Sequence, residues 1–410
     1  MIFNTWVYGV FLAVFFLLYW TVVPPKGRTA ALLAAGLVFY TYYLPVHTIL
    51  IAALILATYG FGSAINRLKA DAPAAESFFN AKNTFVLSVV LCLGVLAYFK
   101  YLGLLAATFD GLVHLLRRGT LYQMPDIVIP LGLSFFIFEF VHYLAEIYKG
   151  TAPKASLTEY AAFGLFFPTL VAGPIKRFQP FLEQLRSPAV FKLEYVTEGL
   201  FRILTGLGKK VIIADSMVIF TGPLANPLSA AGADYWVAVY AFAIKIYFDF
   251  SGYSDIAIGS AKLLGIQVPE NFNWPYLQQN IAAFWNNWHM SLSSWIKDYL
   301  YIPLGGSRGT LLFAVRNLMI AMALCGLWHG AAWNFAVWGL YHGAGLSFYR
   351  IYRKKGAALI NLIERLPGPV TKTVSTVFTF HFVCLGWVFF ATDLNKSFQF
   401  LGALFNTLNL

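Results

Sequence analysis

The sequence predicts an all-α, polytopic membrane protein with about ten transmembrane helices, together with re-entrant and amphipathic helices. Three properties of the chain support this fold class. Hydrophobic residues make up 59% of the 410 residues, whereas charged residues make up only 11%. The mean hydropathy is +0.67. Aromatic residues are also abundant, with 39 Phe and 11 Trp, which is unlike the composition of a soluble domain.

Long apolar runs supply the predicted spans, either alone or paired with a bent neighbour. No soluble linker or low-complexity stretch separates two parts of the chain, and no internal repeat of the transporter kind is visible. Residues 1–410 are therefore predicted to form one membrane-embedded domain. The runs are residues 7–23, 30–44, 49–64, 85–99, 127–147, 235–247, 311–327, 331–348 and 374–390.

Loop charges predict the orientation of these spans. The first run is expected to remain as a helix, because no positive charge precedes it and no small-residue cleavage site follows it. The first loop carries Lys26 and Arg28, the second carries no Lys or Arg, and the third carries Arg67 and Lys82. The N-terminus is therefore expected outside the cytoplasm. The net charge of +11 is scattered between spans, which favours contacts with membrane lipids and argues against nucleic-acid binding.

Pro and Gly interrupt the apolar pattern repeatedly from residue 129 onward. Broken backbone at membrane depth is tolerated only where it is buried in protein or lines a cavity. The chain is therefore expected to build a polar interior surface from Lys176, Arg177, Asp249, Asp255, Asn273, Asn287 and His289.

Two histidines are the main candidates for chemistry. His329 lies between two very apolar stretches, where an ionisable side chain is a functional-site candidate. His289 is its expected partner, with the two segments forming the walls of one site. A histidine in an apolar site stays neutral and can accept a proton, as is needed when a hydroxyl attacks a thioester. The alternative is a structural His329, bonded to a backbone carbonyl and packed between Trp328 and Trp333.

Several motifs combine to resemble the membrane-bound O-acyltransferase family. They are Phe248-Asp-Phe-Ser-Gly-Tyr-Ser, the run Phe284 to Ser293, and Trp328-His-Gly. They are most similar to the bacterial branch that O-acetylates polysaccharides, over roughly residues 129–390. The branch that transfers D-alanyl groups to lipoteichoic acid resembles the chain more distantly, because it shares Trp-His-Met-Ser-Leu-Ser but not Tyr301-Ile-Pro-Leu-Gly-Gly. Ala391 departs from the family pattern, in which an arginine is expected.

This resemblance implies a helical funnel with a central tunnel, in which His329 is catalytic and His289 assists. It implies a multi-pass protein of the bacterial inner (plasma) membrane with no tightly bound cofactor and no metal. The acyl donor, acetyl-CoA or a carrier-protein thioester, is expected from the cytoplasm and the acceptor from outside. An extracytoplasmic acyl-relay or acetyltransferase partner is also expected. The candidate substrate-binding residues are Trp285, Asn286, Asn287, Trp288, Trp328, Lys176, Arg177, Asp249 and Tyr253.

One amphipathic helix is predicted around His289. His289 lies at the edge of its apolar stripe, as an interfacial anchor or a tunnel-lining residue would. The stripe follows spacings of three and four residues and consists of Trp285, Trp288, Leu292, Trp295 and Tyr299.

Two further groups of charged residues have competing interpretations. Lys176 and Arg177 can hold the phosphates of a coenzyme or a pantetheine carrier, or can contact lipid headgroups. Glu139, His142 and Glu146 share a helix face. A carboxylate-bridged metal site would need a second matching helix, which the sequence lacks, so an internal ion-pair network is expected.

Two other classes of protein remain open at this point. A transporter would also contain broken helices and intramembrane charges. A haem protein would use histidines on facing helices, with His142, His329 and His342 as candidates. Neither class accounts for the combined motifs as well as an acyltransferase does.

Overall fold

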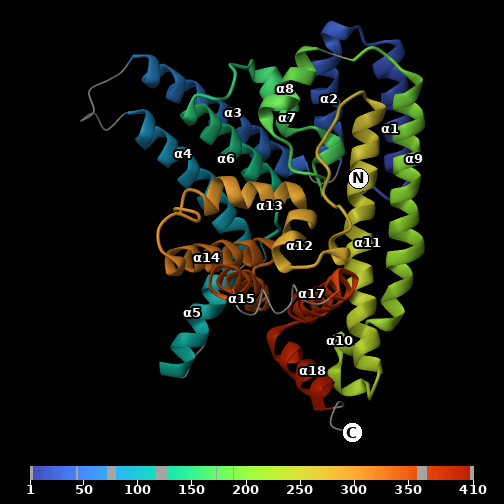
Figure 1. Ribbon diagram of the computed structural model, residues 1–410. Coiled ribbons are helices and arrows are strands. Elements are labelled where there is room, and N and C mark those ends of the chain that lie inside the picture. Colours follow the sequence, from blue (N-terminus) through green and yellow to red (C-terminus); the bar gives the residue numbers. More distant parts are fainter. Residues whose placement is uncertain are drawn as a thin grey trace. The chain divides into compact units, whose positions relative to one another are not determined.

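The computed structural model describes residues 3–42, 45–71, 80–116, 127–171, 173–187, 189–357 and 367–406. These residues form helices joined by turns and loops, with one isolated β-bridge and no strand, so the all-α prediction is confirmed (Figure 1). Contacts divide the chain into two compact units. Unit 1 comprises Met1–Gly206 and Tyr253–Pro269, and unit 2 comprises Leu207–Gly252 and Glu270–Leu410. The single domain stays a prediction.

Unit 1 is built from the N-terminal helices. Within it, α3 packs against α4 and α6, and α2 packs against α7. A π-turn at Ala97–Tyr101 joins α4 to α5. The helices are α1 (Trp6–Thr21), α2 (Arg28–Thr41), α3 (Pro45–Ala70), α4 (Ala81–Leu96), α5 (Leu102–Leu116), α6 (Leu133–Lys149), α7 (Leu157–Gly164), α8 (Phe178–Arg186) and α9 (Leu193–Leu207).

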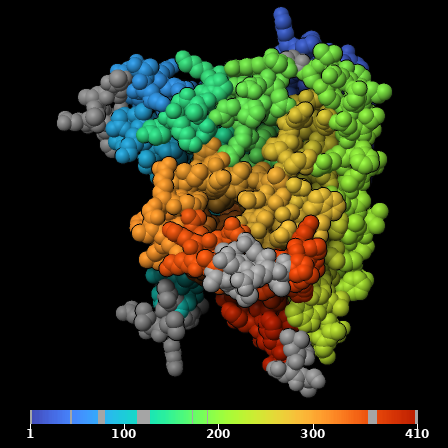
Figure 2. Space-filling view, in the orientation of Figure 1, coloured from blue at the N-terminus to red at the C-terminus, as the bar shows by residue number. Residues whose placement is uncertain are grey.

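Unit 2 carries both candidate catalytic histidines. The long helix α11 (Asp234–Leu263) begins in unit 2 and ends in unit 1. Figure 2 shows residues of α14 and α15, in orange, and of α17 and α18, in red, on one face. The other helices of unit 2 are α10 (Gly222–Ala225), α12 (Ile281–Asn287), α13 (Met290–Ile296), α14 (Leu311–His329), α15 (Trp333–Lys355), α17 (Gly368–Ala391) and α18 (Leu394–Asn406).

Polar caps begin the two helices that lead to the histidines. The Asn280 side chain accepts a 2.8 Å hydrogen bond from the backbone N–H of Ala283, at the start of α12. The Thr310 hydroxyl accepts one of 3.3 Å from the N–H of Phe313, at the start of α14. Each cap satisfies a backbone donor that the first helical turn leaves unpaired.

The α14–α15 hairpin is packed so closely that glycine is required at its crossing. A Cβ atom at Gly326 of α14 would collide with the backbone oxygen of Phe335, and one at Gly339 of α15 would collide with that of Met322. These contacts bring the two backbones together immediately before α14 ends at His329. The close packing of the hairpin therefore fixes the position of the backbone that carries His329.

An aromatic cluster forms the core of unit 2. Trp338 and Phe284 are completely buried, and Trp387 is 1% exposed. The indole N–H of Trp387 donates to the hydroxyl of Tyr276 at 3.0 Å, and that hydroxyl donates to the Ala243 carbonyl at 2.8 Å. The polar atoms of Trp387 and Tyr276 are therefore satisfied inside the cluster. The indole N–H of Trp338 has no hydrogen-bond partner among the described residues.

Each predicted apolar run lies mostly on a helix, although residues 127–132 come before α6 begins, and not every run is established as a membrane span. Among the described residues, four helices are long and apolar enough to cross a membrane: Pro45–Ala70, Ala81–Gly111, Leu311–His329 and Gly368–Ala391. The shorter helix Trp6–Thr21 is also apolar. The count of ten spans therefore stays a prediction. Parts of two predicted loops, residues 43–44 and 72–79, lie outside the described residues.

Candidate active site

His329 is the last residue of α14, and its ring lies in an aromatic environment. Its centroid is 4.7 Å from the Trp328 ring, 5.2 Å from Trp338 and 5.2 Å from Phe390. Trp333 was expected to pack on this ring, but its side chain is 53% exposed. The turn into α15 also places the Trp338 ring beside His329.

His289 lies at a break between two short helices, where one continuous helix was predicted. Its φ of 43° is in the left-handed region, which few residues other than glycine adopt. The prediction of one helix is therefore wrong, although Trp285, Trp288 and Leu292 are buried as expected. The spacing of the apolar residues is the same on both sides of the break. Hydrophobic periodicity therefore could not show that the helix is interrupted at His289.

A neighbouring extended segment holds this break in place. The backbone N–H of Met290 donates to the Asn271 carbonyl at 2.9 Å, and the N–H of Asn273 donates to the Asn287 carbonyl at 3.0 Å. Residues 271–273 thus run antiparallel to residues 287–290, with a bridge between Phe272 and Trp288. These bonds satisfy backbone groups that an interrupted helix would leave unpaired.

Asn271 orients the His289 ring and was not singled out by the sequence analysis. It is completely buried, and its Oδ1 accepts hydrogen bonds from the Ser291 hydroxyl at 2.6 Å and from His289 Nδ1 at 3.3 Å. Because an amide oxygen only accepts, the proton of neutral His289 is placed on Nδ1. Its buried Nε2 has no hydrogen-bond partner within the described part of the chain. This nitrogen is therefore available to accept a proton.

Trp328 brings the two histidines into one site. Its ring centroid is 6.1 Å from that of His289 and 4.7 Å from that of His329. Phe250 covers another side of His289, at 4.6 Å and edge to face. The segments around both histidines therefore meet at Trp328, and their role as walls of one catalytic site stays a prediction. The arrangement offers imidazole nitrogens in apolar surroundings, which suits proton transfer.

A third histidine, His342, lies deeper in the same aromatic cluster. It is completely buried, with ring centroids 5.0 Å from Trp338 and 5.2 Å from Trp285. Neither of its ring nitrogens has a hydrogen-bond partner among the described residues. The sequence analysis considered His342 only as a haem ligand. The structure instead makes it a buried polar group surrounded by aromatic rings.

Three of the candidate substrate-binding residues are buried tryptophans. Trp285, Trp288 and Trp328 are 7%, 3% and 9% exposed, respectively. Asn287 uses its amide to donate to the Ala283 carbonyl at 2.8 Å, whereas Asn286 is exposed. All five residues lie close to the two histidines along the chain, and their contact with substrate stays a prediction.

Asp249, another candidate for substrate binding, forms an ion pair within unit 2. Its carboxylate is 2.8 Å from Lys210 Nζ, and the same ammonium lies 2.7 Å from Asp215. The Lys210 ammonium therefore links two carboxylates. It lies near the junction of a π-helix, Gly208–Ala214, and a 3-10 helix, Asp215–Phe220. This ion-pair network accounts for Asp249 without a ligand.

The remaining candidates lie in unit 1. Lys176 is 2% exposed and pairs with Glu139 at 2.5 Å, and its contact with phosphates or lipid headgroups stays a prediction. Tyr253 donates to the Asn4 side chain at 3.5 Å, and Arg177 is partly buried. The predicted polar surface is thus divided between the two units, and Asp255 on unit 1 pairs with Arg202 at 2.6 Å.

The two acidic residues on the predicted face of α6 form ion pairs, one buried and one exposed. Glu139 pairs with Lys176, and Glu146 pairs with Lys149 at 2.8 Å. His142 accepts a 2.8 Å hydrogen bond at Nε2 from the backbone N–H of Phe178. The described residues contain no cluster of three or more His, Cys, Asp or Glu side chains that could hold a metal ion.

The contrast between His142 and His342 predicts that their replacement changes protein stability by different amounts. Replacing His142 with Leu should destabilise the protein by about 1–3 kcal/mol, because the buried N–H of Phe178 loses its acceptor. Replacing His342 with Leu should change stability by less than about 1 kcal/mol, because no hydrogen bond is lost. Thermal melting of both purified variants measures this difference. An equal loss for His342→Leu would mean that its ring has a polar partner.

Taken together, the helical fold and the apolar helices define an integral membrane protein, in which two histidines lie against one tryptophan ring. The reaction class follows from similarity to a known protein family. The model of MBOAT, the membrane-bound O-acyltransferase family, matches residues 32–386, and the chain belongs to this family. It is therefore an acyltransferase. The match begins well before residue 129, where the sequence resemblance was placed.

Individual relatives agree with this assignment. The chain is 36% identical to a "probable alginate O-acetylase" of Azotobacter vinelandii, covering 97% of this chain and 76% of the relative. It is 32% identical to the peptidoglycan O-acetyltransferase of Helicobacter pylori, covering 90% and 72%. It is 31% identical to the teichoic acid D-alanyltransferase of Bacillus subtilis, but over only 64% of this chain and 68% of the relative.

Proposed function

We propose that this acyltransferase moves an acetyl group from a thioester donor to a hydroxyl group of an exported or cell-envelope polysaccharide, directly or through a partner protein. The similarity to proteins named as alginate and peptidoglycan O-acetylases, which extends over nearly the whole chain, carries this proposal. D-alanyl transfer is the alternative, and the shorter match to the teichoic acid enzyme favours it less. Family membership also favours an enzyme over a transporter or a haem protein.

In the proposed reaction, His329 accepts the proton of the acceptor hydroxyl as its oxygen attacks the thioester carbonyl carbon. A carbon–oxygen bond forms, the carbon–sulfur bond breaks, and the proton on the imidazolium passes to the departing thiolate. Aromatic rings surround His329, and apolar surroundings favour the neutral imidazole, which is the form that can accept a proton.

His289 has an assisting role in this proposal. Asn271 holds the proton on Nδ1, which leaves Nε2 as an acceptor. His289 can therefore take a hydrogen bond from the acceptor hydroxyl and orient it toward His329. Because Trp328 contacts both rings, a substrate that reaches one histidine also lies near the other.

The identity of the donor is tested with purified protein in detergent. Acetyl-CoA and an acetylated acyl carrier protein are each supplied with a soluble oligosaccharide acceptor, and thiol release and acetylated product are measured. Product from either thioester, absent with the His329→Ala variant, supports the proposal and identifies the donor. Transfer of D-alanyl but not acetyl groups from a carrier would replace it with the alternative.

The proposal includes the orientation predicted from loop charge. Donor thioesters come from the cytoplasm, and the basic end of α15 at Arg353 is expected on that side. Labelling of an Arg353→Cys variant by an impermeant thiol reagent in intact cells would contradict this orientation.

A further inference from the structure

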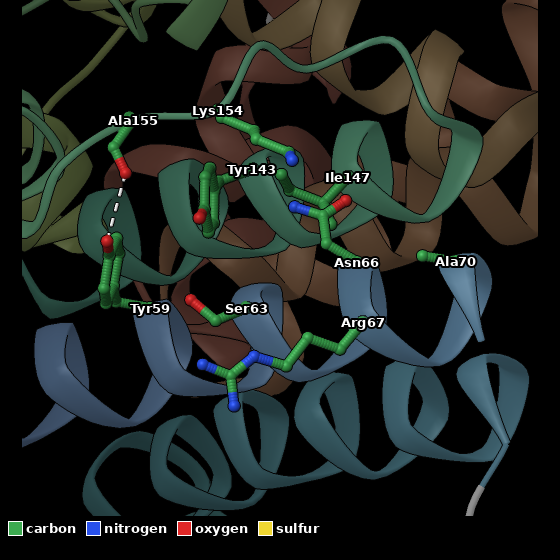
Figure 3. Close-up of a pocket in the computed structure, with 9 residues that line it drawn as sticks. All are labelled: Tyr59, Ser63, Asn66, Arg67, Ala70, Tyr143, Ile147, Lys154 and Ala155. Atoms are coloured by element: carbon green, nitrogen blue, oxygen red, sulfur yellow. Dashed lines mark hydrogen bonds between the residues drawn. The ribbon is translucent and has the colours of Figure 1, made fainter.

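Unit 1 contains a cavity of about 420 Å³, far along the chain from both candidate catalytic histidines. It lies between α3, α6 and the segment that follows α6, as Figure 3 shows. Its size is in the range of small-molecule sites. None of its lining residues is acidic; they are Tyr59, Ser63, Asn66, Arg67, Ala70, Tyr143, Ile147, Lys154 and Ala155.

Helix periodicity and one hydrogen bond build this cavity. The five residues contributed by α3 recur at spacings of three and four, so they share one helix face. Tyr143 and Ile147 face them from α6 in Figure 3. The Tyr59 hydroxyl donates to the Ala155 carbonyl at 3.0 Å, which ties the segment carrying Lys154 to α3. The walls of the cavity are therefore defined by regular structure.

Four polar side chains in this cavity have unused hydrogen-bonding capacity. The side chains of Ser63, Asn66, Arg67 and Lys154 make no hydrogen bond or ion pair with any residue that the structure describes. Two other cations of unit 1 have carboxylate partners, since Lys176 pairs with Glu139 and Arg202 pairs with Asp255. Arg67 and Lys154 are exposed, so a ligand can reach both from outside the protein. The cavity thus gathers two positive charges and additional donors without an anion.

We propose that this cavity binds a phosphate group. A guanidinium and an ammonium are the side chains best suited to phosphate oxygens, and the Ser63 hydroxyl and Asn66 amide supply further donors. Arg67 lies in the last turn of α3, one of the four helices able to span a membrane, and the end of such a span lies at headgroup depth. The headgroup of an anionic phospholipid is therefore one source of the phosphate, and a soluble phosphate ester is the other.

The lipid source is tested by native mass spectrometry of the full chain released from nanodiscs that contain equal amounts of phosphatidylglycerol and phosphatidylcholine. Wild-type protein should retain phosphatidylglycerol preferentially. The double variant Arg67→Gln/Lys154→Gln should retain at least about tenfold less, because two charge-assisted contacts are removed. The matched control Lys82→Gln/Lys192→Gln removes two exposed charges of unit 1 outside the cavity and should bind as wild type does.

The soluble source is tested by calorimetric titration of the same proteins with coenzyme A and with inorganic phosphate. Binding that is weakened in the Arg67/Lys154 variant but not in the Lys82/Lys192 control would assign the phosphate to a soluble ester. Asn66→Leu narrows the cavity without changing charge and should weaken whichever ligand binds, which covers the case of a double variant that does not fold. If wild-type protein binds neither phosphatidylglycerol nor a soluble phosphate, or if Asn66→Leu and the double variant bind as wild type does, the proposal is wrong.

Discussion

The His329→Ala variant is expected to lose acyl transfer by at least about 10²-fold, because it lacks the proposed general base. It should remain folded and membrane-inserted and should still bind the donor, since the ring acts on the acceptor's proton. His289→Ala should cost less if that residue only orients the acceptor. The measurement is acylated product per amount of purified protein for both variants.

A control histidine separates this effect from general damage to unit 2. His381 on α17 forms a 2.8 Å hydrogen bond between its Nε2 and the Tyr240 hydroxyl. It belongs to neither of the motifs that contain His289 and His329. His381→Ala should therefore keep near wild-type turnover per folded molecule. If His329→Ala also keeps near wild-type transfer, His329 is a packed structural histidine and the assignment of the base is wrong.

Lys176→Met is expected to destabilise the protein by about 3–5 kcal/mol, because it leaves the Glu139 carboxylate buried without its partner. Glu139 is 5% exposed and Lys176 is 2% exposed, so water cannot replace the lost contact. Chemical or thermal unfolding of the purified variant measures the loss. Turnover per folded molecule should be largely retained if the ion pair is structural.

Two matched variants sharpen this prediction. The double replacement Glu139→Leu/Lys176→Met removes both charges and should recover most of the lost stability. Lys149→Met breaks the exposed pair with Glu146, where Lys149 is 50% exposed, and should cost no more than about 1 kcal/mol. Equal losses for Lys176→Met and Lys149→Met would show that burial of the first pair has no energetic consequence.

The sequence predicted the features that depend on local pattern. Apolar runs identified the helices, and spacings of three and four identified the buried tryptophans near His289. An ionisable residue in an apolar stretch identified His329, whose ring lies with that of His289 against Trp328. These signals are local because helix formation and burial of one helix face depend on neighbouring residues.

The features that sequence could not predict depend on distant partners. Lys176 looked like a ligand-binding cation because its partner, Glu139, is 37 residues away. The break at His289 depends on pairing with residues 271–273. Nothing in the sequence distinguishes Asn271 from other asparagines. The sequence analysis placed its neighbour Asn273 on the polar interior surface but gave no role to Asn271. Its role becomes visible only when its oxygen is seen to accept from His289.

The left-handed backbone conformation of His289 lowers the stability of the folded protein at a residue that is proposed to assist the reaction. A side chain other than glycine in this conformation costs about 1–3 kcal/mol. Glycine would relieve the strain, but it would also remove the imidazole ring that Asn271 orients. Selection for thermal resistance alone would therefore favour glycine at residue 289. With the proposed role of His289, the strain is retained to orient a proton acceptor, which is a stability–activity trade-off.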